Sequence, residues 1–316
     1  MKVRMKELIR KFAVAISVIA SGMAMADVSP YATGGEVRRI VLDDLHEAYV
    51  HVFTNTSESA TFVGSGRIPL SVRYLIVGAG GCGGKVEQNN GYGCCGGGGG
   101  GVLETNGVAF AADASWTITV GKGAANLDST AEASSICNDK SENWTVPGGG
   151  NGSAGLSRMA TEGAAGGGGA GNNGDYRPAA SGNYRSSIFG EVPDGAPFKG
   201  GDGKIYGGGG GGAGQAGDDA IGGEGLVSDI SGQSLVYGSG GGGGGCLIAA
   251  YKRLGGIGGS RAGDGATWTE KDNGDGTATT NLCDVTIPVA NSGAGGGGGM
   301  RSTKTIAGMK DNQYGV

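Results

Sequence analysis

Several short stretches of the chain alternate hydrophobic and polar residues, which is the pattern of β-strands with one buried face. The clearest example is 115–120, which reads Ser-Trp-Thr-Ile-Thr-Val. After the N-terminal apolar stretch, the chain has almost no helical period. We therefore predict an all-β fold. The predicted strands are 37–42, 48–54, 60–63, 72–77, 115–120, 235–237, 246–251 and 283–287.

Two further segments are predicted to pair as a hairpin. The residues Asp-Asn-Gly-Asp-Gly at 272–276 lie between 266–271 and 277–282. Asparagine, aspartate and glycine tolerate the positive φ angles that tight hairpin turns require. The turn therefore predicts antiparallel pairing of the two segments that flank it.

Glycine is unusually abundant: it accounts for 74 of the 316 residues, where about 7% is usual. Apolar segments adjoin the glycine-rich stretches directly: Val77 precedes Gly78, and Gly245 precedes Cys246. Flexible Gly/Ser linkers join domains through polar sequence instead. The sequence therefore favours packed glycine segments over the alternative, disordered low-complexity tracts. The runs of four or more glycines are 96–101, 166–169, 207–212, 240–245 and 295–299.

A polyproline II-like glycine helix rises about 3.1 Å per residue, so six residues span roughly 19 Å. That length is close to a typical strand, so runs and strands could span one common layer. Ordering six glycines costs on the order of 6–12 kcal/mol, while six net hydrogen bonds return roughly 3–9 kcal/mol. We therefore expect the glycine helices to depend on the β core for stability.

The N-terminus has the pattern of a secretory signal peptide. Basic residues precede an apolar stretch at 12–23, and small residues follow at 24–26. We predict cleavage after Ala26, a glycine-rich domain over 27–299 and a C-terminal tail over 300–316. A retained anchor helix is the alternative, but its apolar core of about a dozen residues is shorter than the roughly 20 needed to span a bilayer. The basic residues are Lys2, Arg4, Lys6, Arg10 and Lys11.

The predicted mature chain is acidic. Removing five basic residues and one acidic residue changes the net charge from −5 to −9. The sequence lacks a basic patch of the kind that binds nucleic acid. After residue 26, no apolar run is long enough to insert into a membrane. We therefore expect a secreted or cell-surface protein.

Six cysteines in a secreted chain are compatible with up to three disulfides, whose pairing the sequence leaves open among 15 arrangements. No Cys-x-x-Cys pair occurs, so structural bridges or buried free thiols are favoured over a metal site. We expect neither a metal nor a cofactor. The candidate disulfide cysteines are Cys82, Cys94, Cys95, Cys137, Cys246 and Cys283.

Patterns for catalysis are weak. Residues 78–83 fit Gly-x-Gly-x-x-Gly after a strand, with Glu104 as a candidate ribose-binding acid, but a dinucleotide site requires a helix at the third glycine. Glycine-rich sequence follows instead. His46 and His51 are the only histidines, and no nucleophile-elbow motif occurs. We therefore predict that the protein is not an enzyme.

A family resemblance adds to these expectations. Phe53-Thr54 is followed by Tyr-Leu-Ile-Val-Gly-Ala-Gly-Gly-Cys-Gly-Gly at 74–84, then by the run 96–101 and Trp-Thr-Ile-Thr-Val-Gly-Lys-Gly at 116–123. This pattern resembles the glycine-rich domain of secreted bacterial proteins and phage tail-tip adhesins, and is similar to the glycine-rich ectodomain of anaplastic lymphoma kinase-type receptors. The resemblance implies a jelly-roll or TNF-like β-sandwich joined to a bundle of polyglycine II helices. The chain departs from the bacterial pattern at 310–316, where an apolar final strand is expected.

Loops that bind a cell-surface receptor are a further implication of the resemblance. Tyrosine and arginine, which binding loops favour, occur in pairs at Tyr176-Arg177 and Tyr184-Arg185, and Tyr92 lies between two glycines. An ordinary polar loop whose tyrosines cover scaffold edges is the alternative. We expect a secreted, non-enzymatic adhesin or receptor-type module that binds a cell-surface protein or glycan. The competing hypothesis is a self-associating component of an extracellular matrix or cell envelope; a homo-oligomer is compatible with both.

Overall fold

The computed structural model describes residues 12–16, 31–43, 46–66, 69–85, 93–140, 142–155, 158–171, 176–203, 206–248, 251–273, 278–283 and 285–302. Within these ranges the regular structure is entirely β, as predicted, with no helix. The strands are β1 (Phe12–Ile16), β2 (Ala32–Thr33), β3 (Glu36–Asp43), β4 (His46–Val52), β5 (Ala60–Gly64), β6 (Leu70–Val77), β7 (Val102–Phe110), β8 (Ser115–Thr119), β9 (Ser134–Asn138), β10 (Asn143–Val146), β11 (Ala170–Gly171), β12 (Tyr176–Arg177), β13 (Ser187–Ile188), β14 (Leu226–Ser228), β15 (Leu235–Tyr237), β16 (Cys246–Ile248), β17 (Tyr251–Arg253), β18 (Thr267–Asp272), β19 (Ala278–Cys283) and β20 (Arg301–Ser302).

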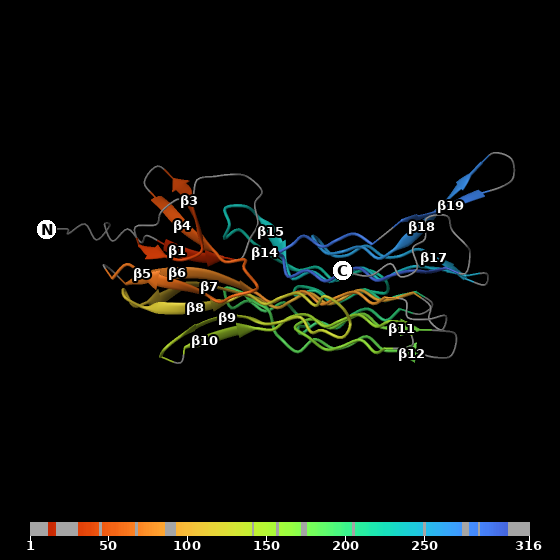
Figure 1. Ribbon diagram of the computed structural model, residues 1–316, viewed down its shortest axis with the longest axis horizontal. Helices are drawn as coiled ribbons and strands as arrows, with labels where there is room; N and C mark the ends of the chain where they lie inside the picture. Colours follow the sequence, from red (N-terminus) through yellow and green to blue (C-terminus); the bar gives the residue numbers. More distant parts are fainter. Residues whose placement is uncertain are drawn as a thin grey trace.

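Two large sheets lie at one end of the elongated molecule (Figure 1). The first has the order β13-β7-β6-β1-β4-β3, and the second has the order β10-β9-β8-β5-β2. Every neighbour pair of the second sheet is antiparallel. In the first sheet, β1 runs parallel to both β4 and β6, and β13 runs parallel to β7, while the other pairs are antiparallel.

One hydrophobic core joins the two sheets. Val72, Tyr74 and Ile76 occupy alternate positions of β6 and face the same cluster as Trp116 and Ile118 of β8. Within the cluster, the rings of Phe110 and Trp116 stack with centroids 4.1 Å apart. Period-two alternation places these residues on one face of each strand, so the pattern predicted from sequence is the pattern that builds the core.

The other face of the first sheet packs against the hairpin β14–β15. Val50, Leu75 and Val77 contact a second buried cluster that includes Ile230 and Tyr237. Because β6 contributes to a core on both of its faces, its C-terminal half reads as an unbroken apolar run.

The glycine segments extend away from the sheets as long, winding, hydrogen-bonded stretches (Figure 1). Residues 94–101 lie among the others, and their donor bonds repeat with a period of three. Gly96 and Gly99 donate to Gly208 and Gly211, at 2.9 Å each. Gly97 and Gly100 donate to 293–296, and Gly98 and Gly101 donate to 147–150, at 2.7–3.0 Å. Every third N–H group therefore points to the same neighbour.

The carbonyl groups of 94–101 follow the same rule toward three other neighbours. Those of Cys95, Gly98 and Gly101 accept from 78–84, those of Gly96 and Gly99 accept from 165–168, and those of Cys94 and Gly97 accept from 241–244. One glycine segment is thus surrounded by six others, three that accept its bonds and three that donate to it. All eight N–H groups of 94–101 and the seven carbonyl groups named above are therefore paired, as buried backbone groups must be.

The strands expected within 37–77, at 115–120 and at 235–237 are present, and β18 pairs with β19 as the predicted hairpin. The segment 246–251 corresponds to two antiparallel strands, β16 and β17.

Two predictions about the elements are wrong. No strand is formed at 285–287, where Thr286 Oγ1 accepts a hydrogen bond from the Asp264 backbone N–H at 2.7 Å and Ile287 is 74% exposed. The prediction that glycine runs and strands span one common layer is also wrong. β6 continues directly into 78–84, and the glycine segments lie end to end with the sheets (Figure 1).

The terminal segments are only partly described. Residues 12–16, which belong to the expected leader, form β1 in the first sheet. The expected cleavage site at Ala26 and the tail from 303 onward lie outside the described residues.

Candidate binding surface

The glycine segments hold several short hairpins far from the two large sheets. We call this region the distal end; it carries β11–β12, β16–β17 and β18–β19 (Figure 1). Glycine segments lead to these hairpins, since 240–245 runs directly into β16 and 166–169 runs directly into β11. The distal hairpins are therefore positioned by the hydrogen-bonded glycine backbone.

Aromatic and charged side chains gather at the distal end. The guanidinium carbon of Arg253 lies 5.7 Å from the ring centre of Tyr206, and Lys252 Nζ lies 5.7 Å from the ring centre of Trp268. The Tyr206 hydroxyl donates to Asp219, and Trp268 Nε1 donates to the Arg253 carbonyl at 3.1 Å. We call Tyr206, Asp219, Lys252, Arg253 and Trp268 the distal cluster.

Local structure explains how these residues meet. Tyr206 immediately precedes the run 207–212, and the Gly207 N–H donates to the Gly244 carbonyl at 2.9 Å. Two residues after Gly244, β16 begins, and its Cys246 pairs with Arg253 of β17. The contact between two glycine segments thus brings Tyr206 to the β16–β17 hairpin.

The electrostatics of the cluster favour contact with a polar partner. Lys252 and Arg253 are exposed, while Tyr206 and Trp268 are half-buried. Burial, with the neighbouring Asp219 carboxylate, raises the pKa of Tyr206 to about 12, so its hydroxyl remains a donor at neutral pH. Cations above aromatic faces are held in place by the ring quadrupole. Rigid aromatic rings next to arginine are typical of energetically important contact residues.

The structure separates the two Tyr-Arg pairs singled out in the sequence. Tyr176 and Arg177 form β12 at the distal end, paired with β11. Tyr184 instead lies near the sheets and packs against their shared core, while Arg185 is exposed. Tyr92 lies outside the described residues. Tyr184 therefore matches the alternative of a tyrosine that covers the scaffold.

Sequence reasoning did not single out the distal cluster. Its members come from four separate segments, and only the folded glycine backbone brings them together. Two local signals were available. Tyr206 immediately precedes the hexaglycine run 207–212, and Lys252-Arg253 follow the apolar segment 246–251, which begins directly after the run 240–245.

The candidate disulfides are a correction, because none of the six cysteines forms a disulfide in the structure. Cys82, Cys94, Cys95 and Cys246 are buried, and Cys95 Sγ lies 2.9 Å from Ser153 Oγ. Burial raises the pKa of the Cys95 thiol to about 11 and that of Cys82 to about 12. These thiols stay protonated at neutral pH and act as small apolar groups within the glycine segments.

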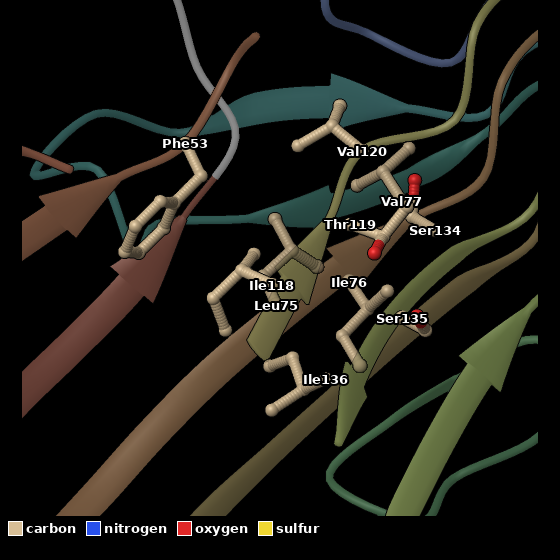
Figure 2. Close-up of a pocket in the computed structure, with 10 residues that line it drawn as sticks. All are labelled: Phe53, Leu75, Ile76, Val77, Ile118, Thr119, Val120, Ser134, Ser135 and Ile136. Carbon is tan, nitrogen blue, oxygen red and sulfur yellow. The ribbon is translucent and has the colours of Figure 1, made fainter. Parts of the chain in front are cut away.

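Two cavities lie near the sheets, away from the distal cluster. The smaller, about 30 Å³, is lined mainly by apolar side chains of β6, β8 and β9 together with Phe53 and Val120, while Thr119, Ser134 and Ser135 add hydroxyl groups (Figure 2). The larger, about 320 Å³, is lined by Thr56 and by residues of 77–81, 120–125 and 288–296; Lys122 is not among them, and none of the lining side chains is ionisable. Its lining is mostly backbone and small apolar groups, which offers hydrogen bonding but no proton donor or base.

Glu104, the candidate ribose-binding acid, has a different role. Its side chain is fully buried, and Oε1 accepts a bond from Arg73 Nε at 2.6 Å. Arg73 also pairs with Asp229, and this pairing lowers the pKa of that carboxyl. Phe189 covers the guanidinium, with 4.9 Å between Arg73 Cζ and the ring centre. Glu104 therefore ties β7 to β6 through Arg73, and Arg73 in turn links β6 to the loop after β14.

The described ranges contain no group of three or more metal-binding side chains. In the same ranges, no helix is long and apolar enough to cross a membrane. A search of curated proteins and a search of solved structures each return no significant match. A family model described as a glycine-rich domain matches residues 56–311, which is most of the chain. The chain therefore belongs to the glycine-rich domain family.

Proposed function

We propose that the chain folds as a β-sandwich joined to a bundle of polyglycine II helices. The shared core of the two large sheets supports the first part. The period of three in the bonds of 94–101 supports the second, because a polyproline II-type helix has three residues per turn and no internal hydrogen bonds. Six hydrogen-bonded neighbours are what such helices need to satisfy their backbone groups.

On this scaffold we propose a secreted, non-enzymatic binding module that recognises a cell-surface protein or glycan through its distal end. The observation that carries the proposal is the distal cluster, where two cations of β17 lie over two aromatic rings, Trp268 of β18 and Tyr206 at the start of the run 207–212. A rigid scaffold lowers the entropy lost on binding, because the contact residues are already ordered. The hairpin β11–β12, which contains Tyr176 and Arg177, also lies at the distal end.

Binding of purified protein to cells or a glycan array tests this function. The double variant Tyr206→Ala and Arg253→Ala should weaken binding by about 2 kcal/mol or more, or roughly thirtyfold, as hot-spot residues do. Lys122→Ala, which removes an exposed charge near the sheets, is the matched control. Equal binding by all three proteins, with unchanged melting temperatures, would contradict the proposal.

Self-association is the second candidate, and two exposed isoleucines favour it. Ile257 is 66% exposed and Ile287 is 74% exposed. Asp264 brings their segments together, because its carboxylate accepts bonds from the Gly258 N–H and the Thr286 hydroxyl. Under this alternative, light scattering would grow with concentration, and the double variant Ile257→Ser and Ile287→Ser would abolish that growth.

A further inference from the structure

The first sheet contains a strand that the proposed mature protein would lack. β1 lies between β4 and β6 and pairs with both, through Ala13–Ile16 on one side and Phe12–Ala15 on the other. These residues precede Ala26, where we expect the leader to be removed. Processing would therefore leave β4 and β6 facing each other across a space one strand wide.

Such a space would have unusual chemical properties. The backbone of Tyr49–Val52 on β4 and of Ser71–Tyr74 on β6 would lose its ladder partners. The flanking side chains belong to the interior, since Val50 is 2% exposed and His51 and Val72 are 0% exposed. Unpaired backbone groups in an apolar setting are costly, so a strand that satisfies both edges is strongly favoured.

We propose that the space between β4 and β6, here called the strand slot, accepts an extended apolar segment of a partner polypeptide in trans. The inference rests on the secreted state proposed above, because the slot opens only when residues 1–26 are removed. β-strand addition of this kind draws affinity from main-chain bonds and specificity from alternate side-chain positions. A bound partner strand would also hold the protein at a surface while leaving the distal end free.

The register of β1 indicates which strands fit. Its sequence is Phe-Ala-Val-Ala-Ile, with no charged residue. Small residues occupy alternate register positions: Ala13 is opposite Tyr49 and Val72, and Ala15 is opposite His51 and Tyr74. The slot should therefore prefer at least five uncharged residues in which small residues alternate with larger apolar ones.

The test uses the exported protein, recovered from the medium or periplasm, with its N-terminus determined by mass spectrometry. A labelled peptide of residues 11–18 is titrated against it, and hydrogen exchange is followed in β4 and β6. The control peptide carries Ala13→Pro and Ala15→Pro, which keep the peptide apolar but remove two N–H donors. Unprocessed full-length chain, whose slot is filled, is the control protein.

The proposal predicts a mature N-terminus at Asp27, saturable peptide binding and slower exchange in β4 and β6 when the peptide is bound. The proline peptide should bind about tenfold more weakly or worse, and the unprocessed chain should not bind. Equal binding of both peptides, or full protection of β4 and β6 without peptide, would overturn the slot. An intact Met1 on the exported protein would overturn it as well. None of these readouts involves the distal cluster, so failure of the slot leaves receptor binding separately testable.

Discussion

At the residue scale, the glycines of 96–101 are required for close contact and not for unusual backbone angles. None of them adopts a positive φ. A Cβ on Gly99 would lie 2.0 Å from the Gly238 carbonyl oxygen, and one on Gly97 would lie 2.3 Å from that of Gly81. These contacts are with backbone, which cannot move aside as a flexible side chain can. The number and bunching of glycines could be read from the sequence, but the partners of each one could not, because every contact joins distant segments.

Gly99→Ala should therefore destabilise the protein. The added methyl group must displace a neighbouring glycine segment, and overpacking of this kind costs about 1–3 kcal/mol or more. Gly123→Ala is the matched control, since its Cβ would lie 3.7 Å from the nearest atom, Gly80 O. Urea unfolding should show a lower midpoint for Gly99→Ala alone. An unchanged midpoint for both variants would mean that the segments are not packed against each other.

His51 predicts a dependence of stability on pH. Its Nδ1 donates to the Gly34 carbonyl at 2.7 Å, while the buried Nε2 has no hydrogen-bond partner. Burial lowers the pKa of His51 below its usual value near 6.5, because a second proton would have to enter an apolar site. The contribution of the neutral ring to stability is thus complete above pH 6.5 and is lost as pH falls toward the folded-state pKa.

Melting temperatures measured between about pH 7.5 and pH 5 should therefore fall on the acid side. His51→Asn keeps a donor for the Gly34 carbonyl but does not titrate, so the fall should be shallower in this variant. An identical decline in both proteins would assign the effect to other groups.

At the element scale, alternation was sufficient to find strands with one buried apolar face, such as β8. It missed β9 and β10, because Ser134–Asn138 and Asn143–Val146 are mostly polar and are held by ladder pairing with β8 and with each other. It wrongly added a strand at 285–287, where alternation is present but no neighbouring strand accepts it among the described residues. Strand pairing is a tertiary property, so pattern alone decides it only when a buried face is also present.

The Arg73–Glu104 pair is the polar connection between β6 and β7. Glu104→Gln keeps the shape of the buried side chain but leaves the partly buried Arg73 cation with a weaker partner, and breaking a buried pair costs about 3–5 kcal/mol. Asp229→Asn removes the second carboxylate that pairs with Arg73. Because the Asp229 side chain is 73% exposed, this change should cost less than about 1 kcal/mol. Denaturant unfolding of the two variants measures the difference. Equal losses in the free energy of unfolding would show that the burial of Glu104 does not strengthen its interaction with Arg73.

At the scale of the whole molecule, the glycine segments connect two ends with different roles. The sheets supply the apolar core that ordering of glycine requires, and the segments carry hairpins to the distal end. The sequence predicted the all-β class and the family but not the distal cluster, whose residues lie far apart along the chain. It could not predict the six-neighbour arrangement of 94–101 either, since identical glycines carry no information about which segment lies beside which.

Amide hydrogen exchange of the glycine segments tests this account most directly. In the purified protein, peptides covering 96–101, 207–212 and 240–245 should be strongly protected, because their N–H groups bond to neighbouring segments at 2.7–2.9 Å over most of their length. Gly99→Ala should reduce that protection, while Gly123→Ala should leave it unchanged. Exchange at random-coil rates would contradict the packed scaffold and, with it, the binding surface that the scaffold is proposed to hold.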